Sequence, residues 1–591
     1  MKFDILNYKF GRFSAAVAVM LVWACIYLPG LGSREVQGNE PKRTMPAISM
    51  IQSGNWITPE LAGEKYYKKP PLINWMIATS FKLTGSTDEF SARLPSALSI
   101  LFFALLIVVM PSGFLGIDGK IISSIIFLTT LGIIDKGRLI EIDGAYAGIT
   151  GMAVLAWLNY RSLNSSRWLL WMIPGIILGL GLLLKGPLIL VFFYSVVFFC
   201  LYYERKLREL RSFHHAAGIT VMVLVFSIWA VTVLISKQSD VTSVPGNAPP
   251  VASKMSSEWL SDILDNVIGM DSLKGDKPWW AKLSKIFFSW SRDVLQGLCY
   301  FLPWLLFIPS LRREKIFEKL HENEKIIVKS LFWAIVVGVA CLMMQPGVRA
   351  RYFVPLIALS SVMTGFMLSR LQDNSGPLRT WRNTVLALSI ISAFGLAVGI
   401  FLVSMRFIAK IFEILKVKPP LPLDYTYYLP ELLTSVLTAA FLVYFFKKMD
   451  KFTDSLKLSL ASAGIAIIIV FQICCFVFPV IRQFEVKRPA GIAINRAVPP
   501  GETLFLYNFG ISNYTPFIYY IRQPTGYLFE GDELTGKEKY ILFEKGTFGG
   551  MVNDYNIASR DPRLMLELAY KKKKYVIIRF EKPPPKIPGL N

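Results

Sequence analysis

The sequence predicts an α-helical polytopic membrane protein that crosses the bilayer about 13 times and carries a small α/β domain at its carboxyl-terminal end. Three observations support this prediction. Long apolar segments recur up to residue 480, basic residues gather in the short loops between them, and short strand-like segments follow residue 480. We therefore divide the chain into a transmembrane region, residues 1–480, and an extracytoplasmic domain, residues 481–591.

Each predicted span is an apolar segment of roughly 18 residues or more, the length that a helix needs to cross the hydrocarbon core. The spans are expected near residues 13–31, 92–115, 119–135, 143–160, 168–184, 187–203, 216–236, 286–310, 326–344, 352–370, 384–405, 430–446 and 457–480. The first segment follows Lys2, Lys9 and Arg12, as in a signal peptide, but its apolar stretch is too long for one. We interpret it as an uncleaved first span.

The chain has a net charge of +23, from 64 Lys and Arg against 41 Asp and Glu. In a soluble protein this excess would indicate a nucleic-acid partner, but here the basic residues concentrate in short loops, as cytoplasmic orientation signals do. With the amino terminus in the cytoplasm, the basic loops that fall inside are residues 202–215, 311–325, 369–383 and 447–457. This orientation places residues 32–91 and 481–591 outside, and we expect no nucleic-acid partner.

The first outer segment, residues 32–91, is too long and too patterned for a simple connector. Pro41 follows a polar and an acidic residue, and apolar residues recur at helical spacing until Gly54, which predicts one amphipathic helix. A second helix is expected from Pro70 to Gly85. Both should lie flat on the membrane, with charged residues beside the lipid headgroups.

The carboxyl-terminal domain alternates predicted strands and helices, separated by Gly and Pro. Strands are expected at residues 503–507, 540–543 and 575–580, and helices at residues 513–521 and 562–570. This domain contains no cysteine, so no disulfide holds it together. The six cysteines of the chain lie in or beside apolar segments, without the spacing of a metal site.

Ionisable groups at a membrane edge are costly and are therefore candidates for function. Those predicted on the outer side are Glu35, Glu40, Arg43, Lys69, Arg138, Glu141, Asp143, Lys185, Arg349 and Arg351, with Tyr352 beside them. Carboxylates and several cations on one membrane face suit a reaction on a lipid-linked phosphate. Lys and Arg would hold the phosphate, and a carboxylate would take the proton of an acceptor hydroxyl.

Several of these residues also have a purely structural interpretation. Glu40 could be a solvated residue of its loop. Asp143 lies next to the start of a span and could have the purely structural role of a helix cap. Lys185 could extend to the interface, although a Lys-Gly-Pro break between apolar segments favours a function. Arg349 and Arg351 could anchor the end of a span.

The first outer loop resembles that of the lipid A aminoarabinose transferases, in the run GNEPKRTMPAISMIQSGNWITPELAGEKYYKKPPLINW. These enzymes are polyprenyl-phosphate-sugar-dependent glycosyltransferases of the GT-C superfamily, related to the protein O-mannosyltransferases. Their pattern there is an Asp-Glu pair, a basic residue, S-G-[DN]-W-[IL]-x-P and Lys-Pro-Pro. Later family landmarks look similar and occur in the right order, namely SARLPSAL, the Asp143 region, LLKGP and RARYFVP. The likeness therefore covers essentially the whole chain.

The resemblance implies a transmembrane domain of the GT-C type, with an extracytoplasmic active site under the first outer loop. Asp143 matches the acid of the family's second outer loop. The positions that match family contacts to the lipid phosphate are Lys69, Lys185, Arg349, Arg351 and Tyr352.

One position departs from the family pattern, because Asn39 stands where the first acid of the Asp-Glu pair is usual. An amide has no useful basicity, so Asn39 cannot act as a general base. Glu40, Asp143 or Glu35 would then take this role, and we favour Glu40 as the catalytic base, with Asp143 beside it. The residues expected to support the site are Asn39, Glu35, Arg43 and Arg138.

The inventory of metal ligands on the outer side is poor. His214, His215 and His321 lie in predicted cytoplasmic loops, so an outer zinc site would lack imidazole and thiolate ligands. We expect no metal and no other cofactor. A hard divalent cation on Glu40, Asp143 and the phosphate is the alternative that the carboxylates leave open.

Together these features predict a monomeric, multi-pass glycosyltransferase of the bacterial inner membrane, with an extracytoplasmic active site and carboxyl-terminal domain. It would move a sugar, with inversion, from a polyprenyl-phosphate donor to an envelope acceptor, either a lipid A-like glycolipid, a glycan or a protein. One alternative is a flippase or transporter of lipid-linked sugars, which should show internal repeats and broken helices in matching halves. Another is an envelope glycan ligase or polymerase, which keeps the fold and changes the acceptor.

Overall fold

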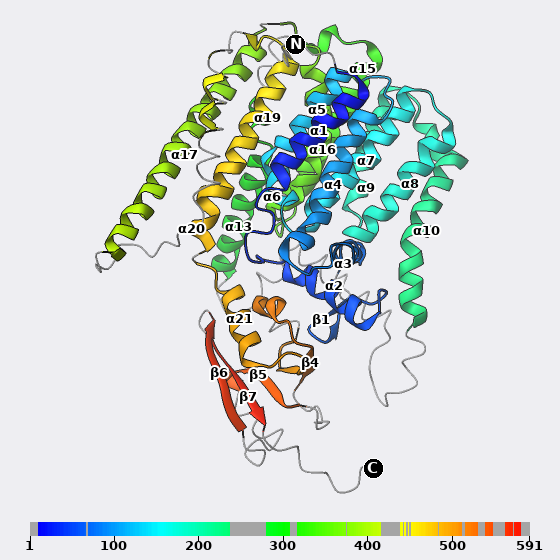
Figure 1. The fold of residues 1–591 in the computed structure, drawn as a ribbon. Helices are drawn as coiled ribbons and strands as arrows, with labels where there is room; N and C mark the ends of the chain where they lie inside the picture. The colour runs from blue at the N-terminus through cyan, green and yellow to red at the C-terminus, as the bar shows by residue number, and fades with distance from the viewer. Residues whose placement is uncertain are drawn as a thin grey trace.

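The computed structural model describes most of the chain. The described ranges are residues 10–66, 69–236, 279–307, 316–373, 375–414, 451–482, 484–510, 515–529, 538–547, 562–570 and 573–580, with isolated positions between 436 and 447. A bundle of helices runs from the end that carries the amino terminus to the end that carries a small sheet domain (Figure 1).

The bundle is built from helices at the predicted spans. Its members are α1 (Arg12–Tyr27), α4 (Glu89–Val109), α5 (Ile117–Thr129), α6 (Leu131–Gly137), α7 (Ile142–Ser162), α8 (Arg167–Leu184), α9 (Leu188–Tyr203), α10 (Phe213–Ser236), α13 (Trp279–Cys299), α15 (Glu322–Met343), α16 (Val354–Leu368), α17 (Gly376–Ile414), α19 (Ser455–Gln472) and α20 (Phe478–Arg482). Short helical turns join them at η2 (Leu207–Arg211), η4 (Trp304–Phe307), η5 (Ile316–Lys319), η6 (Ala350–Phe353) and η8 (Ile473–Val477). Most of the predicted span at residues 430–446 lies outside the described residues.

The described helices are those of a membrane protein. By length and composition, six of them are long and apolar enough to cross a membrane, or up to seven if the bent pair α5 and α6 is one span. Helix α10 exposes large apolar side chains, such as Leu224 at 57% and Ile228 at 70%. Such a surface would be a liability in water but suits contact with lipid. The count of thirteen spans stays a prediction.

The centre of the bundle is formed by α4, α5, α7 and α16, whose side chains are mostly buried. Helices α5 and α16 approach so closely that a Cβ on Gly365 would lie 2.6 Å from the backbone of Ser123. Small residues allow this contact, which is a common way to pack helices where the hydrophobic effect does not operate between them.

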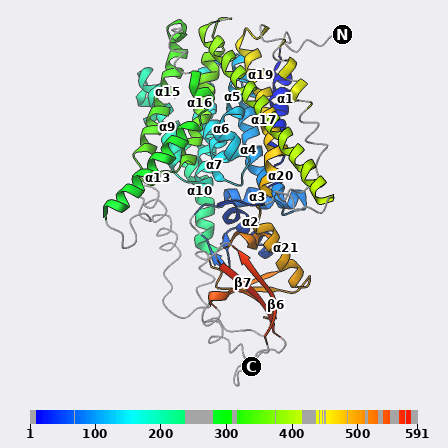
Figure 2. The same cartoon turned by 90° about the vertical axis from the view of Figure 1, so that its left-hand side faces the viewer.

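The two predicted amphipathic helices are confirmed as α2 (Pro41–Ser53) and α3 (Leu72–Thr84). Each ends at a glycine in the left-handed conformation, Gly54 with φ +73° and Gly85 with φ +67°. The helices lie across the end of the bundle, between it and the sheet domain (Figure 2). A small hairpin between them, β1 (Glu60–Leu61) and β2 (Glu64–Lys65), was not predicted.

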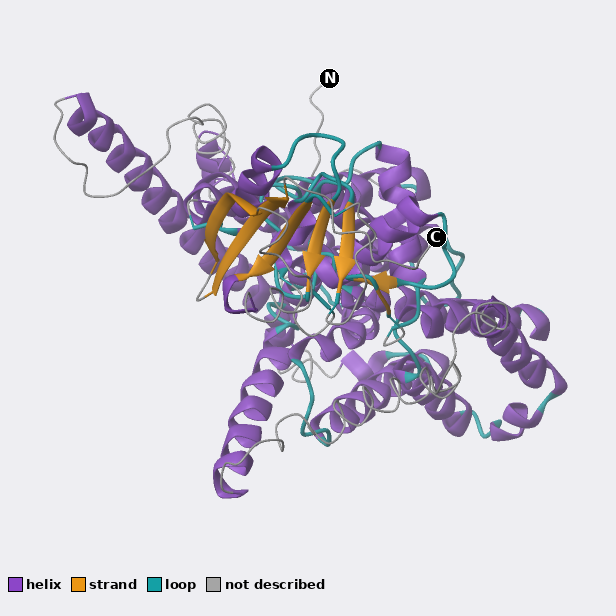
Figure 3. Cartoon of the chain, turned by 90° about the horizontal axis from the view of Figure 1, so that it is seen from below, coloured by secondary structure: helices purple, strands orange, loops and turns teal. Residues whose placement is uncertain are grey.

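The carboxyl-terminal domain contains one five-stranded sheet (Figure 3). Its elements are α21 (Lys487–Ala497), β3 (Leu504–Tyr507), η9 (Pro516–Tyr520), β4 (Thr525–Leu528), β5 (Tyr540–Glu544), η10 (Lys545–Thr547), β6 (Pro562–Tyr570) and β7 (Lys573–Phe580). The strand order is β4-β3-β5-β7-β6, with β3 parallel to β4 and β5 and the other pairs antiparallel. Ile494 of α21 and Phe517 of η9 pack on one face of this sheet, against Ile577 of β7.

The predictions for this domain have mixed outcomes. The strands expected at residues 503–507, 540–543 and 575–580 are confirmed as β3, β5 and β7. Of the helix expected at residues 513–521, the described part is the 3-10 turn η9. The prediction of a helix at residues 562–570 is wrong, because this segment is the edge strand β6 and pairs antiparallel with β7. Its Leu, Met, Glu and Ala favour a helix locally, and tertiary pairing overrides this preference. Strand β4 was not predicted.

Candidate active site

A small polar pocket lies where the first outer loop meets the end of the bundle. The segments that form it come from four distant parts of the sequence. Its lining residues are Asn39, Arg43, Lys69, Ile140, Glu141, Ile142, Asp143, Lys185, Arg351 and Tyr352. The structure thus brings together most of the charged residues that the sequence singled out.

Asp143 is the buried centre of this pocket. It lies in the first turn of α7, where the helix dipole favours a carboxylate, and its side chain is 5% exposed. One carboxylate oxygen accepts a hydrogen bond from Lys185 Nζ, and the other lies 3.6 Å from Nε of Arg351. Asp143 therefore holds two cations beside each other.

Lys185 follows the last residue of α8, in the break that separates α8 from α9. Its Nζ lies 4.3 Å from the ring centroid of Tyr352 and 5.3 Å from that of Tyr146, within the range of cation–π attraction. The Tyr146 hydroxyl donates to the Gly186 carbonyl at 2.9 Å and accepts from the Ile189 amide at 2.6 Å, which braces the break. Burial lowers the pKa of Lys185, and the negative charge of Asp143 opposes this shift.

Arg351 and Tyr352 belong to the turn η6, which precedes α16. Oδ1 of Asp293, a buried residue of α13, accepts from the Ala350 amide at 3.3 Å and holds this turn against α13. Arg349, also predicted to contact the phosphate, is exposed at the start of η6 and is not among the lining residues. The structure therefore places Arg351 and Tyr352, but not Arg349, at the pocket.

Glu40, the base favoured from the sequence, is buried behind the pocket rather than in its lining. Its side chain is 1% exposed, and it accepts hydrogen bonds from Arg93 Nε and Nη2, each at 2.9 Å. It also accepts from the backbone amides of Ile140 at 2.8 Å and Gln37 at 2.6 Å. Each carboxylate oxygen thus already accepts two hydrogen bonds. This environment suits a structural clamp and leaves Glu40 no capacity to take a proton from a substrate.

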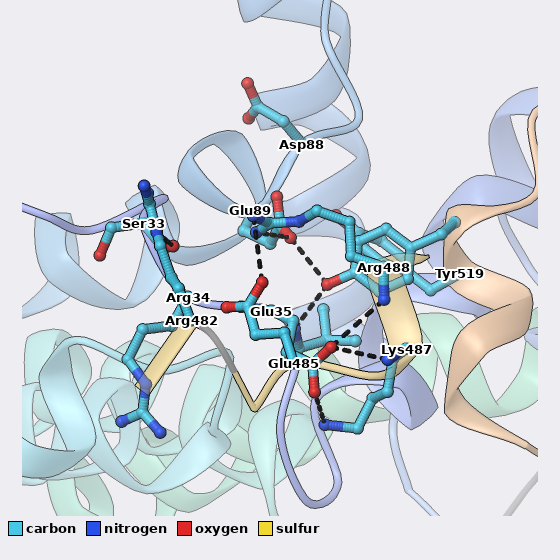
Figure 4. Close-up of polar contacts among 12 residues, drawn as sticks. Ser33, Arg34, Glu35, Asp88, Glu89, Arg482, Glu485, Lys487, Arg488 and Tyr519 are labelled. Atoms are coloured by element: carbon cyan, nitrogen blue, oxygen red, sulfur yellow. Dashed lines mark hydrogen bonds and ion pairs between the residues drawn. The ribbon is translucent and has the colours of Figure 1, made fainter. Parts of the chain in front are cut away.

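Two residues predicted to support the site have structural contacts outside the pocket. Arg138 donates to the carbonyls of Ile26 and Pro29, at the end of α1. Glu35 accepts from the backbone amides of Lys487 at 2.8 Å and Arg488 at 3.2 Å, and so caps the amino terminus of α21 (Figure 4). Glu35 therefore ties the first outer loop to the carboxyl-terminal domain.

This tie is part of a wider polar interface between the loop and the carboxyl-terminal domain (Figure 4). Nη2 of Arg488 lies 2.7 Å from a carboxylate oxygen of Glu89, in the first turn of α4. The Tyr520 hydroxyl donates to the same oxygen at 2.7 Å and accepts from the Val36 amide at 2.8 Å. The interface thus joins the carboxyl-terminal domain to both ends of the segment that carries Glu40.

Glu141 lines the pocket, although the sequence placed it among the outer ionisable residues without indicating a role in the site. It precedes α7, and its Oε2 is buried without accepting a hydrogen bond, although Lys136 Nζ lies 3.4 Å away. Burial raises the pKa of Glu141, and the positive charge of Lys136 opposes this shift. The signal was present in the sequence, since Glu141 and Asp143 are two acids, separated by one residue, at the edge of an apolar segment.

The donor set does not fit a divalent cation shared by Glu40 and Asp143. The oxygens of Glu40 bind Arg93 and backbone amides, and those of Asp143 face Lys185 and Arg351. Within the described residues, His, Cys, Asp and Glu form no group of three or more that could hold a metal ion. Metal independence itself stays a prediction.

Comparison with known families gives a consistent picture. The family model described as dolichyl-phosphate-mannose-protein mannosyltransferase matches residues 68–231. Two similar relatives are each named undecaprenyl phosphate-alpha-4-amino-4-deoxy-L-arabinose arabinosyl transferase. The protein from Pectobacterium carotovorum is 23% identical over 65% of this chain and 65% of its own length, and that from Aeromonas hydrophila is 24% identical over 63% and 64%. The chain thus matches slightly less than two thirds of each relative.

The fold also matches a solved structure. The crystal structure of ArnT from Cupriavidus metallidurans bound to undecaprenyl phosphate superposes with a TM-score of 0.63, over 96% of this chain and 97% of that one, at 15% identity. At this identity the match establishes the fold. Together with the sequence matches, it confirms the predicted resemblance: the chain is similar to the aminoarabinose transferases and has their GT-C type of fold.

Proposed function

We propose that this protein is an integral-membrane glycosyltransferase that moves a sugar from a polyprenyl-phosphate donor to an acceptor of the cell envelope. The observation that carries the proposal is the composition of the pocket. Arg43, Lys69, Lys185 and Arg351 line the same small cavity as Asp143 and Glu141, at one end of an apolar helical bundle. A lipid-linked phosphate has a charged head and an apolar tail, which suit these two environments.

The charge of the pocket suits the departing phosphate. Four cationic side chains line it against two carboxylates, a formal excess of two positive charges. The donor is a phosphodiester with one negative charge, and the departing polyprenyl phosphate gains a second charge as the bond to the sugar breaks. The cations therefore stabilise the transition state more than the bound donor, which is the condition for catalysis.

The residues have distinct roles in this proposal. Lys185 and Arg351 bind the phosphate, and Asp143 keeps them side by side. Lys69 and Tyr352 complete the phosphate site from the loop and from η6, and Asn39 and Arg43 line it from the loop. The acceptor attacks the anomeric carbon from the face opposite the phosphate, so the configuration at this carbon inverts. Glu40, Glu35 and Arg138 support the surrounding structure.

The setting of the reaction follows from the same proposal. We place the pocket and the carboxyl-terminal domain, residues 481–591, on the extracytoplasmic face of the bacterial inner membrane, and the thirteen spans in residues 1–480. The basic loops at the opposite end of the bundle support this orientation. The protein acts as a monomer, and its acceptor is a lipid A-like glycolipid, a glycan or a protein.

An assay of donor consumption tests the proposal. Purified protein is given a panel of undecaprenyl-phosphate sugars with an envelope extract, and release of undecaprenyl phosphate is measured. The wild type should release it, and Lys185→Ala and Asp143→Asn should lose about 100-fold or more of the rate. Lys206→Ala, which changes a lysine with a 57% exposed side chain outside the pocket, is the matched control. Donor that is bound but never consumed would favour the transporter.

A further inference from the structure

The pocket contains a carboxylate with unused hydrogen-bonding capacity. Glu141 lines the cavity, and its side chain is 15% exposed. Its Oε2 is buried and accepts no hydrogen bond. It faces Lys136 Nζ at 3.4 Å, whose positive charge compensates part of the cost of burying an ionised oxygen without a hydrogen bond. A molecule bound in the pocket would therefore reach this carboxylate at its other oxygen, Oε1.

The other acids near the pocket are already occupied. Both oxygens of Glu40 are saturated by Arg93 and two backbone amides. Asp143 is held by Lys185 and Arg351, which the proposed function assigns to the phosphate. The amide of Asn39 cannot take a proton. Among the described lining residues, Glu141 is the carboxylate that is partly exposed and is not held by the cations assigned to the phosphate.

A second polar network contacts Glu141 and is formed by residues that do not line the pocket. Lys136 Nζ lies 3.4 Å from its Oε2 and 3.1 Å from Asp135 Oδ2. Asp135 in turn accepts a hydrogen bond from the Tyr300 hydroxyl at 3.0 Å, at the end of α13. If Glu141 becomes protonated, Lys136 keeps Asp135 as its counter-charge. The network can therefore tolerate a change of charge on Glu141 without leaving a buried cation unpaired.

We propose that Glu141 is the catalytic base and that the acceptor is a hydroxyl group. The inference rests on the proposed function and names its acceptor class. The acceptor oxygen forms a bond to the anomeric carbon, and the bond from that carbon to the phosphate oxygen breaks. Its electron pair stays on the polyprenyl phosphate, and the hydroxyl proton passes to Glu141 and then to water. An ionised phosphate acceptor has no proton to lose and needs no base. A pocket that binds a phosphate acceptor would therefore not require this carboxylate.

The test compares Glu141→Gln and Glu141→Asp with the wild type in full-length protein. Binding of undecaprenyl phosphate, the product common to all donors, shows whether the pocket is intact. We expect this binding to be retained and single-turnover consumption of the donor to fall about 100-fold or more in Glu141→Gln, with partial recovery in Glu141→Asp. Glu60→Gln, which changes a carboxylate of β1 that does not line the pocket, should match the wild type.

The linkage in the product tests the acceptor class. A sugar on a hydroxyl is a glycoside and should survive mild acid, whereas a glycosyl phosphate is hydrolysed. An acid-labile product, or a Glu141→Gln variant with the wild-type rate, would overturn the inference while the proposed function stands. If the wild type consumes no donor, the proposed function fails, and the inference fails with it.

Discussion

Glu40 and Arg93 form a buried ion pair with two hydrogen bonds of 2.9 Å, joining the first outer loop to α4. The remaining guanidinium nitrogen, Nη1, donates to the carbonyls of Leu31 at 2.8 Å and Arg34 at 3.0 Å. The pair thus fixes the path of the loop from the end of α1 to the start of α2. Because Asn39 precedes Glu40 directly, this pair also sets one wall of the pocket.

Glu40→Gln should destabilise the protein strongly. The substitution leaves the Arg93 guanidinium buried without its counter-charge, a change that typically costs about 3–5 kcal/mol. Thermal unfolding of the purified protein in detergent measures the effect. Glu322→Gln is the matched control, because it removes an ion pair in which the glutamate is 83% exposed and should change stability little. Equal melting temperatures for the two variants would contradict the structural role of Glu40.

Arg488→Ala should loosen the carboxyl-terminal domain from the rest of the protein. The variant loses the ion pair with Glu89 and leaves that buried carboxylate with the Tyr520 hydroxyl. Limited proteolysis should then cut the polypeptide around α21 faster than in the wild type. In a double-mutant cycle with Glu89→Gln, we expect a coupling of about 0.5–3 kcal/mol. Additive effects of the two changes would show that the pair does not hold the interface.

Binding of undecaprenyl phosphate should weaken as the pH rises. Burial lowers the pKa of Lys185, so its positive charge is lost at a lower pH than that of an ordinary lysine, and the phosphate loses a partner there. Asp143 opposes the shift, while Arg351 and Lys69 add to it. Lys185→Arg keeps its charge over this range and should lose the pH dependence. Titration of both proteins with undecaprenyl phosphate between neutral and alkaline pH measures this. An identical decline in both would exclude Lys185 as its cause.

Removal of divalent cations should leave the transfer rate unchanged. The carboxylates of Glu40 and Asp143 are paired with Arg93, Lys185 and Arg351, so a cation between them would have to displace these partners. The measurement is donor consumption after treatment with EDTA and again after addition of Mg²⁺ or Mn²⁺. A rate that falls with EDTA and returns with either metal would show that a cation takes part.

The elements found from the sequence are those whose signals are local. Proline at one end and glycine at the other bound α2 and α3, because each residue restricts the backbone at its own position. The spans follow from the length of their apolar segments. The exception is residues 562–570, where helix-forming residues occur in a strand. Pairing of this segment with β7 provides backbone hydrogen bonds that local preference does not anticipate.

The sequence by itself determined the membrane class of this protein, its amphipathic outer helices and the residues from which a phosphate site could be built. Only the tertiary structure decided which carboxylate lies in the pocket. Glu40 is clamped by an arginine 53 positions away, and Glu35 caps a helix 453 positions away, so neither lines the pocket. Glu141 lines the pocket, and its Oε2 accepts no hydrogen bond, although Lys136 Nζ lies 3.4 Å away. Contacts between distant segments depend on how the helices pack, and the order of residues along the chain does not specify them locally.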